Sequence, residues 1–249
     1  MRVLQKAVLL LLLFSCVQKT GSEIRVEEAA SQQETIRDIP PTGIENKCSY
    51  ENETSTLGMG LVLAPSGFAL YNDSLLTDEF AGIDIYRDQA AFSRICPKFF
   101  MPDYGIMHFV CVDSTANAYQ ILTDFSSVKF IEKDSGAEFT TWENYILRSF
   151  GIRRLAENKS AAPVQDDLRV GPSEDSEVLA IPEGFEMFCP MEIRDHWVKV
   201  KYDCFYNTDE NPHEGEPCYN FIGDCKDPLT GWLKWREGNK VLIDIFLIP

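Results

Sequence analysis

The chain has 249 residues, of which 45% are hydrophobic, and it carries a formal net charge of -16 at pH 7. This composition is that of a folded globular protein rather than of a disordered chain. The excess of carboxylates repels both nucleic-acid phosphates and anionic lipid headgroups. The composition therefore argues against a nucleic-acid partner and against direct adsorption to an anionic membrane.

The N-terminus has the pattern of a secretion signal. Arg2 and Lys6 precede an apolar run from residue 7 to residue 14, which is shorter than the roughly 20 apolar residues of a membrane-spanning helix. The run ends in LFSC at residues 13–16, which resembles the lipobox of bacterial lipoproteins. The resemblance implies removal of residues 1–15, acylation of Cys16 with palmitate or a similar chain, and anchoring in the bacterial cell envelope, at the outer membrane. The alternatives are a transmembrane anchor and a cysteine without lipid.

Two polar stretches divide the rest of the chain. Residues 16–47 contain few aliphatic side chains and a Pro-Pro pair, a composition typical of a flexible tether. A second polar stretch, residues 153–165, predicts a linker. We therefore expect an N-terminal domain over residues 48–152 and a C-terminal domain over residues 166–249.

The N-terminal domain is predicted to be rich in β-structure. Three strand-like runs, joined by turns of Asp, Ser, Thr and Asn, have the sequences GIMHFVCV, NAYQILTDF and VKFIEK. After them, Trp142, Tyr145, Ile146 and Phe150 recur at helical spacing behind a threonine cap. This pattern predicts one helix packed on the sheet.

Residues 166–249 read as almost entirely β-structure, with five or six short strands separated by Gly and Pro turns, which predicts a small barrel. Four motifs in order resemble the bacterial SH3-like (SH3b) domain. They are DLRVGPS at 167–173, VL at 178–179 with the EG turn after it, HWVKVKY at 196–202 and TGWLKW at 230–235. The resemblance covers residues 166–236 and implies an SH3-like barrel. The Gly-Pro-Ser turn is then expected to let Leu168 and Val178 reach a common core.

Three regions go beyond this resemblance. Residues 203–229 form an acidic, cysteine-bearing insertion, and an extension after residue 236 has Val241, Ile243 and Ile245 on one parity, which predicts an added edge strand. Residues 118–132 also resemble the central strands of the family. The N-terminal domain is thus expected to be either a degenerate SH3-like barrel with one added helix or an unrelated α+β domain.

The insertion raises the question of a metal site. Cys204, His213, Cys218 and Cys225 all lie in it, but their spacing fits no standard zinc pattern. The many carboxylates of the insertion lack the ordered ladder of an EF-hand calcium loop. The sequence therefore predicts neither a metal nor any other cofactor.

Thiol catalysis is the second question, because bacterial SH3-like domains often accompany papain-like cell-wall peptidases. The nucleophile of such an enzyme lies at a helix N-terminus beside an activating His. Cys225 is the nearest candidate, and Pro228 three residues later argues against a helix there. The sequence predicts no catalytic residue and no enzyme. Cys111 and Cys189, within apolar strand patterns, are expected to be small core residues.

The oxidising compartment of an exported protein favours disulfides. Cys218 and Cys225 would close a short loop, and the sequence predicts a bridge between them. Seven cysteines follow Cys16. At least one thiol is therefore expected to be free or to pair between chains.

Strand parity indicates a binding surface. In HWVKVKY, the side chains of Val198, Val200 and Tyr202 share one face, the expected core face. The other face places a Trp among lysines, a surface suited to recognition. The alternative is that the tryptophans are buried by the insertion or by the N-terminal domain. The candidate ligand-binding residues are Trp197, Lys199, Lys201, Trp232, Tyr206 and Tyr219.

Together these features predict a non-catalytic envelope lipoprotein that is mainly β-structure. By resemblance it acts as a binding module for cell-wall peptidoglycan, a peptide or a protein partner of the envelope, and it contacts the membrane only through its lipid. One alternative is a structural or inhibitory protein that docks a single partner through both domains. The other is an accessory subunit of a cell-wall hydrolase.

Overall fold

The computed structural model of the chain describes residues 54–87, 95–155, 167–183 and 185–249. The chain divides into two compact units, residues 1–42 and residues 43–249, and every described residue belongs to the second. The predicted signal, Cys16, the tether and most of the predicted linker lie outside the described residues.

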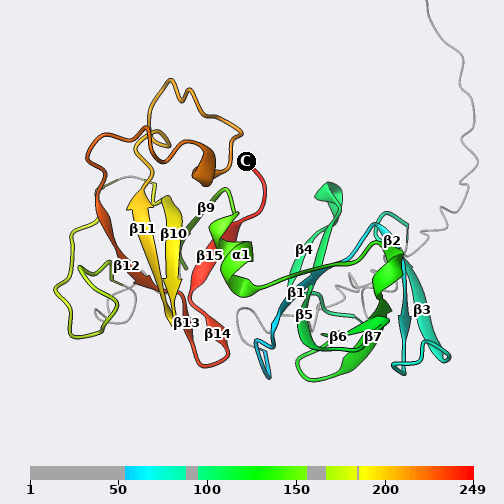
Figure 1. Cartoon of the computed structure of the whole chain (residues 1–249). Helices are drawn as coiled ribbons and strands as arrows, with labels where there is room; N and C mark the ends of the chain where they lie inside the picture. Colours follow the sequence, from blue (N-terminus) through cyan, green and yellow to red (C-terminus); the bar gives the residue numbers. More distant parts are fainter. Residues whose placement is uncertain (1–53, 88–94, 156–166, 184) are drawn as a thin grey trace, which may run out of the picture. The chain divides into compact units, whose positions relative to one another are not determined.

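The described residues form a mainly β protein with antiparallel sheets and one short helix, as the sequence predicts (Figure 1). The elements of the first half are β1 (Gly60–Leu63), β2 (Gly67–Tyr71), β3 (Glu79–Asp84), β4 (Phe99–Met101), β5 (Ile106–Ser114), β6 (Ala118–Leu122), β7 (Val128–Glu132), β8 (Glu138–Thr140) and α1 (Trp142–Leu147). Those of the second half are β9 (Gly151–Arg154), β10 (Phe188–Arg194), β11 (Trp197–Tyr202), β12 (Thr230–Lys234), β13 (Arg236–Glu237), β14 (Lys240–Val241) and β15 (Ile243–Phe246).

An eight-stranded sheet contains the three strand-like runs of the N-terminal half. Its order is β3-β2-β7-β6-β5-β1-β8, with β4 paired to β5. The runs become β5, β6 and β7, three neighbours joined by short turns, as their alternating pattern predicts. The predicted helix is α1, and the hydroxyl of Thr141 accepts a hydrogen bond from the amide of Asn144 at 3.2 Å. This is the expected threonine cap.

A five-stranded sheet holds most of the second half, in the order β12-β11-β10-β9-β15. The predicted edge strand is β15, and Ile243 and Ile245 are buried. β10 contains Pro190, and its register with β11 shifts between Pro190 and Glu192. A proline removes one ladder hydrogen bond and is tolerated at such an irregularity. In the part of the chain that the structure describes, the order of strands is open and neither sheet closes into a barrel.

The predicted opening strands of the C-terminal half are reduced to isolated bridges. Arg169 bridges to Val178 on one side and to Trp232 of β12 on the other. The prediction for Leu168 is confirmed, since it is fully buried, but Val178 is 49% exposed. Leu179, whose amide donates to the Leu168 carbonyl, packs on the core instead. The reason is that the bridge aligns Val178 with Arg169 rather than with Leu168.

The predicted domain boundary at residues 152 and 153 falls within β9, which pairs with β10 and β15 of the five-stranded sheet. One hydrophobic cluster also takes side chains from both sheets, including Leu61 and Val110 from the first and Val198 and Leu233 from the second. Trp142 of α1 lies in this cluster. The division into two domains stays a prediction.

Candidate functional site

Two disulfides fix the insertion at residues 203–229. Cys189 of β10 is bonded to Cys218, and Cys204 is bonded to Cys225. The predicted Cys218–Cys225 bridge is therefore wrong. Proximity in sequence suggested it, whereas the tertiary structure brings β10 beneath the insertion. Cys189 is buried as predicted, yet it is half of a bridge rather than an isolated core thiol.

The remaining described cysteines differ from each other. Cys96 is also disulfide-bonded, whereas Cys111 is a free, buried thiol, as expected of a small core residue. Burial raises the pKa of the Cys111 thiol to about 11. At neutral pH it is therefore not a thiolate nucleophile.

A small core of its own stabilises the insertion. Cys189, Cys218 and Phe221 are buried together. The ring of His213 stacks on Phe221 with ring centroids 4.8 Å apart and meets Phe205 edge to face, also at 4.8 Å. Aromatic packing thus fixes the imidazole in place, although it lies on a long loop.

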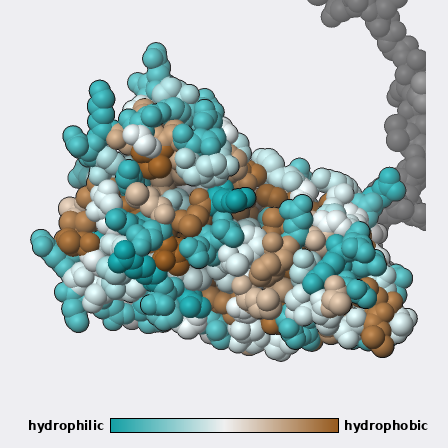
Figure 2. Space-filling model, viewed as in Figure 1, coloured by the Kyte–Doolittle hydropathy of each residue, from teal (hydrophilic) through white to brown (hydrophobic). Residues whose placement is uncertain are grey.

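A cavity of about 660 Å³ lies between the insertion and the C-terminal segment. Figure 1 shows these two segments next to each other, in orange and red, at one end of β10 and β11. The insertion has a mainly hydrophilic outer surface with apolar atoms at its base (Figure 2). The volume is within the range of small-ligand and side-chain pockets. Its apolar lining consists of Phe150, Met187, Phe221, Phe246, Ile248 and Pro249.

The polar lining of this cavity is acidic. Its carboxylates are those of Asp203, Asp209, Glu214 and Glu216. Among the described residues that line it, the imidazole of His213 is the one basic side chain, and none is Lys or Arg. His213 Nε2 lies 3.5 Å from an oxygen of Asp224, and Nδ1 lies 3.8 Å from an oxygen of Glu216. The cavity therefore combines apolar walls with a negative potential.

Asp203 is the deepest of these carboxylates, with 4% of its surface exposed. Its Oδ1 accepts hydrogen bonds from the amides of Phe205 at 2.9 Å and Tyr206 at 3.2 Å. Oδ2 accepts none from the described part of the chain. The pKa of Asp203 is raised, because the effect of burial is larger than the opposing effect of these two amide hydrogen bonds. One oxygen thus organises the loop, and the residue as a whole belongs to the cavity lining.

Two exposed aromatic side chains, Tyr206 in the lining and Phe185 beside it, define the mouth of the cavity. Tyr206 lines it, and its ring lies 5.0 Å from that of Phe185. The Arg153 guanidinium lies over the rings of Phe185 and Phe246, at 5.1 and 5.0 Å. It also donates two hydrogen bonds to Asp244 Oδ2, at 2.7 and 2.9 Å. The charge of this arginine is therefore already neutralised at the mouth.

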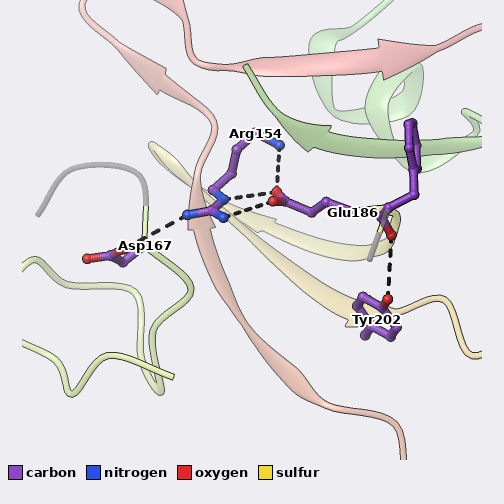
Figure 3. Close-up of polar contacts among 5 residues, drawn as sticks. Arg154, Asp167, Glu186 and Tyr202 are labelled. Carbon is purple, nitrogen blue, oxygen red and sulfur yellow. Dashed lines mark hydrogen bonds and ion pairs between the residues drawn. The ribbon is translucent and has the colours of Figure 1, made fainter. Parts of the chain in front are cut away.

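A buried ion pair holds the segment beneath the mouth. The guanidinium of Arg154 donates to both oxygens of Glu186, at 2.9 and 2.8 Å, and lies 3.9 Å from Asp167 (Figure 3). The hydroxyl of Tyr202, labelled in Figure 3, donates to the Phe185 carbonyl at 3.5 Å. Glu186 therefore anchors the backbone between Phe185 at the mouth and Met187 in the lining.

The structure separates the six predicted ligand-binding residues. Trp197 and Trp232 are 8% and 5% exposed, so the predicted outward Trp surface is absent. Trp232 is covered by Arg194 and Lys199, whose charged groups lie 5.0 and 5.9 Å from its ring centroid. The core face was predicted correctly for Val198 and Val200, both fully buried. Parity identifies the two faces of a strand, but both faces of β11 are covered.

Of the remaining candidates, only Tyr206 lines the cavity. Tyr219 lies on the same insertion and is 59% exposed, and Lys199 and Lys201 belong to the sheet rather than to the cavity lining. Sequence reasoning considered His213 only as a metal ligand and did not predict that Asp203 and His213 line a common cavity. The available signal for Asp203 was its position directly before Cys204, at the start of a loop that connects two strands of the five-stranded sheet.

The described residues contain one set of three metal-ligating side chains whose atoms converge, namely Cys189, Asp203 and Cys218. Two of these sulfurs are joined to each other and cannot act as thiolate ligands. The acidic side chains of the cavity are thus spread around it rather than gathered around a single ion.

Disulfides form and persist in oxidising compartments. The two bridges therefore indicate an extracytoplasmic location for this part of the chain. Within the described residues, no helix is long and apolar enough to cross a membrane.

Comparison with known proteins gives no match: the chain fits no protein-family model, and no curated protein or solved structure is significantly similar to it.

Proposed function

We propose that the chain is a non-catalytic binding module of the bacterial cell envelope and that acyl chains on Cys16 anchor it to the membrane. Its ligand is a peptide segment, and the binding site is the cavity between the insertion and the C-terminal segment. The peptide part of cell-wall peptidoglycan is the ligand that best fits an envelope protein of this kind.

The cavity is the observation that carries this proposal. It is about 660 Å³ in volume and has apolar walls, polar groups at fixed positions and an aromatic mouth, which are the features of a ligand site. Two disulfides and a buried ion pair support it from below. A rigid frame of this kind reduces the ordering cost of binding.

The resemblance to SH3-like domains supports the same proposal. β10, β11 and β12 are consecutive antiparallel neighbours, and the 167–173 motif adds to β12 through Arg169 and Trp232. This arrangement is compatible with an SH3-like barrel that the insertion and β15 have modified. In this proposal the family supplies the frame, and the insertion supplies the site.

A sedimentation experiment with purified peptidoglycan sacculi tests the function. We expect the full chain to sediment with sacculi and Tyr206→Ala to reduce the bound fraction severalfold, because the variant removes the ring at the cavity mouth. Tyr219→Ala is the matched control, since Tyr219 lies on the same insertion, is exposed and does not line the cavity. It should bind like the wild type.

Two outcomes contradict the proposal. If the protein stays in solution with sacculi over a range of salt concentrations, the wall is not the ligand. If the two tyrosine variants bind equally well, the site is not the cavity, whatever the ligand.

A further inference from the structure

The chemistry of the cavity also bears on the ligand, provided that the cavity is the binding site proposed above. The insertion, residues 203–229, contains seven Asp and Glu residues and one Lys. Four of these carboxylates line the cavity, and no Lys or Arg of the part of the chain that the structure describes does so. A ligand with negative charge would be repelled, whereas a positively charged group would gain from every carboxylate in the wall.

The cation must be larger than a metal ion. Among the described residues, none of the cavity's carboxylates belongs to a set of three converging ligand atoms that is free of the Cys189–Cys218 disulfide. A divalent ion needs several oxygens at 2.0 to 2.6 Å, and dispersed carboxylates do not supply them. They suit an organic cation that reaches across the cavity.

The apolar walls require that this cation has a hydrocarbon part. Phe150, Met187, Phe221, Phe246 and Ile248 offer no hydrogen bonds from their side chains to a ligand. Lys and Arg side chains match such a lining, because their methylene stems bury against apolar surface while the charged head reaches a polar group.

The head would reach Asp203. This carboxylate is buried, lines the cavity and uses Oδ1 for the amides of Phe205 and Tyr206, which leaves Oδ2 without a hydrogen bond from the described residues. A carboxylate oxygen without another donor is a strong acceptor for an ammonium or guanidinium group.

We propose that the cavity recognises a basic side chain of a peptide, with the aliphatic stem against the apolar walls and the charged head at Asp203. Recognition is by ion pairing and burial, and no covalent step is involved. This inference rests on the proposed function and specifies the class of ligand that the module selects.

The test uses two capped pentapeptides, Ala-Ala-Lys-Ala-Ala and the same peptide with norleucine in place of lysine. Norleucine keeps the hydrocarbon stem and lacks the charge. NMR titration of the isotope-labelled full chain at pH 7 reports both affinity and position. We expect the lysine peptide to bind about tenfold or more tightly than the norleucine peptide. The largest shifts should be at the amides of Phe205 and Tyr206.

A pair of variants separates the site from general electrostatics. Asp203→Asn keeps an oxygen that can accept the two amide hydrogen bonds and removes the charge, so it should abolish the preference for lysine over norleucine. Asp227→Asn is the matched control. It makes the same change of charge in the same insertion, at an exposed residue outside the lining, and Asn tolerates the positive φ of 49° at this position.

Equal affinity for the two peptides, no binding of either, or an equal effect of the two Asn variants overturns the inference. These outcomes are distinguishable from failure of the proposed function. If sedimentation with sacculi depends on Tyr206 but the titration shows no preference for lysine, the proposed function stands. The inference that the ligand is a basic side chain is then rejected. A lysine preference that depends on Asp203, without binding to sacculi, supports the inference and assigns the peptide to another envelope partner.

Discussion

His108 and Tyr145 connect the eight-stranded sheet to α1 through a hydrogen bond between His108 Nδ1 and the Tyr145 hydroxyl, 2.8 Å long. Burial lowers the pKa of His108 from 6.5 to about 4 and raises that of Tyr145. Both groups are therefore neutral at pH 7. Lys98 directly precedes β4, and burial of its amine lowers its pKa to about 8.

Because the pKa of His108 is lowered in the folded chain, we expect the free energy of unfolding to fall in mild acid. Below pH 6.5 the unfolded chain binds a proton at His108 that the folded chain does not bind until about pH 4. Stability should be fully present above pH 6.5 and fall toward pH 4, by on the order of 3 kcal/mol for this group. Urea unfolding at pH 7 and pH 5 measures the fall. His108→Asn, which keeps an acceptor near Nδ1, should reduce it. An unchanged pH dependence in this variant would show that other groups are responsible.

The burial of single residues could be predicted from the sequence only in part. Parity predicted the buried faces of Val198 and Val200, because alternation along a strand is a local property. It could not predict that Trp197 and Trp232 are buried, because what covers the second face of a sheet comes from distant parts of the chain. The same holds for Asp203, whose burial depends on the return of the insertion to β10.

At the scale of the elements, the TGW motif has a structural role in joining β12 to the 167–173 segment. A Cβ on Gly231 would lie 2.7 Å from Leu168 Cγ and 2.9 Å from the Arg169 carbonyl oxygen. Leu168 is fully buried, so a shift of its side chain would disturb the packing of the core. The glycine therefore permits the close approach of the two segments, as glycines in strands often do.

Gly231→Ala should therefore destabilise the fold by about 1–3 kcal/mol, the usual cost of overpacking a core. Gly223→Ala is the control, because nothing lies within 4 Å of a Cβ at that position. It should change stability by less than about 0.5 kcal/mol. Urea unfolding of the two variants makes the comparison. Equal stabilities would mean that the 167–173 segment does not pack on β12 as described.

The elements themselves were largely predictable where their pattern is strong. β5, β6, β7, α1 and β15 follow from alternation, helical spacing or a cap within one stretch of sequence. The strands expected around the Gly-Pro-Ser turn are not present, because Arg169 forms only isolated bridges there. Its guanidinium instead donates to the carbonyls of Glu174 and Ser176 and so stabilises the turn itself.

At the scale of the whole molecule, two disulfides hold the insertion, which forms one wall of the cavity. Cys189–Cys218 ties the insertion to β10, and Cys204–Cys225 closes a loop with a sequence separation of 21 residues. Peptide mapping of unreduced protein by mass spectrometry should recover both bridges. A peptide containing a Cys218–Cys225 bridge would contradict this arrangement.

The double variant Cys204→Ala, Cys225→Ala should lose about 3 kcal/mol of stability, the chain-entropy value for a loop of this length. Since the same loop carries most of the acidic lining, we also expect weaker binding of the lysine peptide. Urea unfolding without reductant measures the first effect, and the NMR titration measures the second. A variant that keeps full stability would show that the insertion's small core and Cys189–Cys218 suffice.

The sequence by itself determined the mainly β class, the helix with its threonine cap, the edge strand and the expectation of an oxidising compartment. Each of these depends on composition or on the spacing of residues within one short segment. Only the tertiary structure decided the cysteine pairing, the burial of both tryptophans and the meeting of Asp203, His213 and the C-terminal segment around one cavity. These features depend on contacts between residues that are distant in sequence, and no local pattern encodes such contacts.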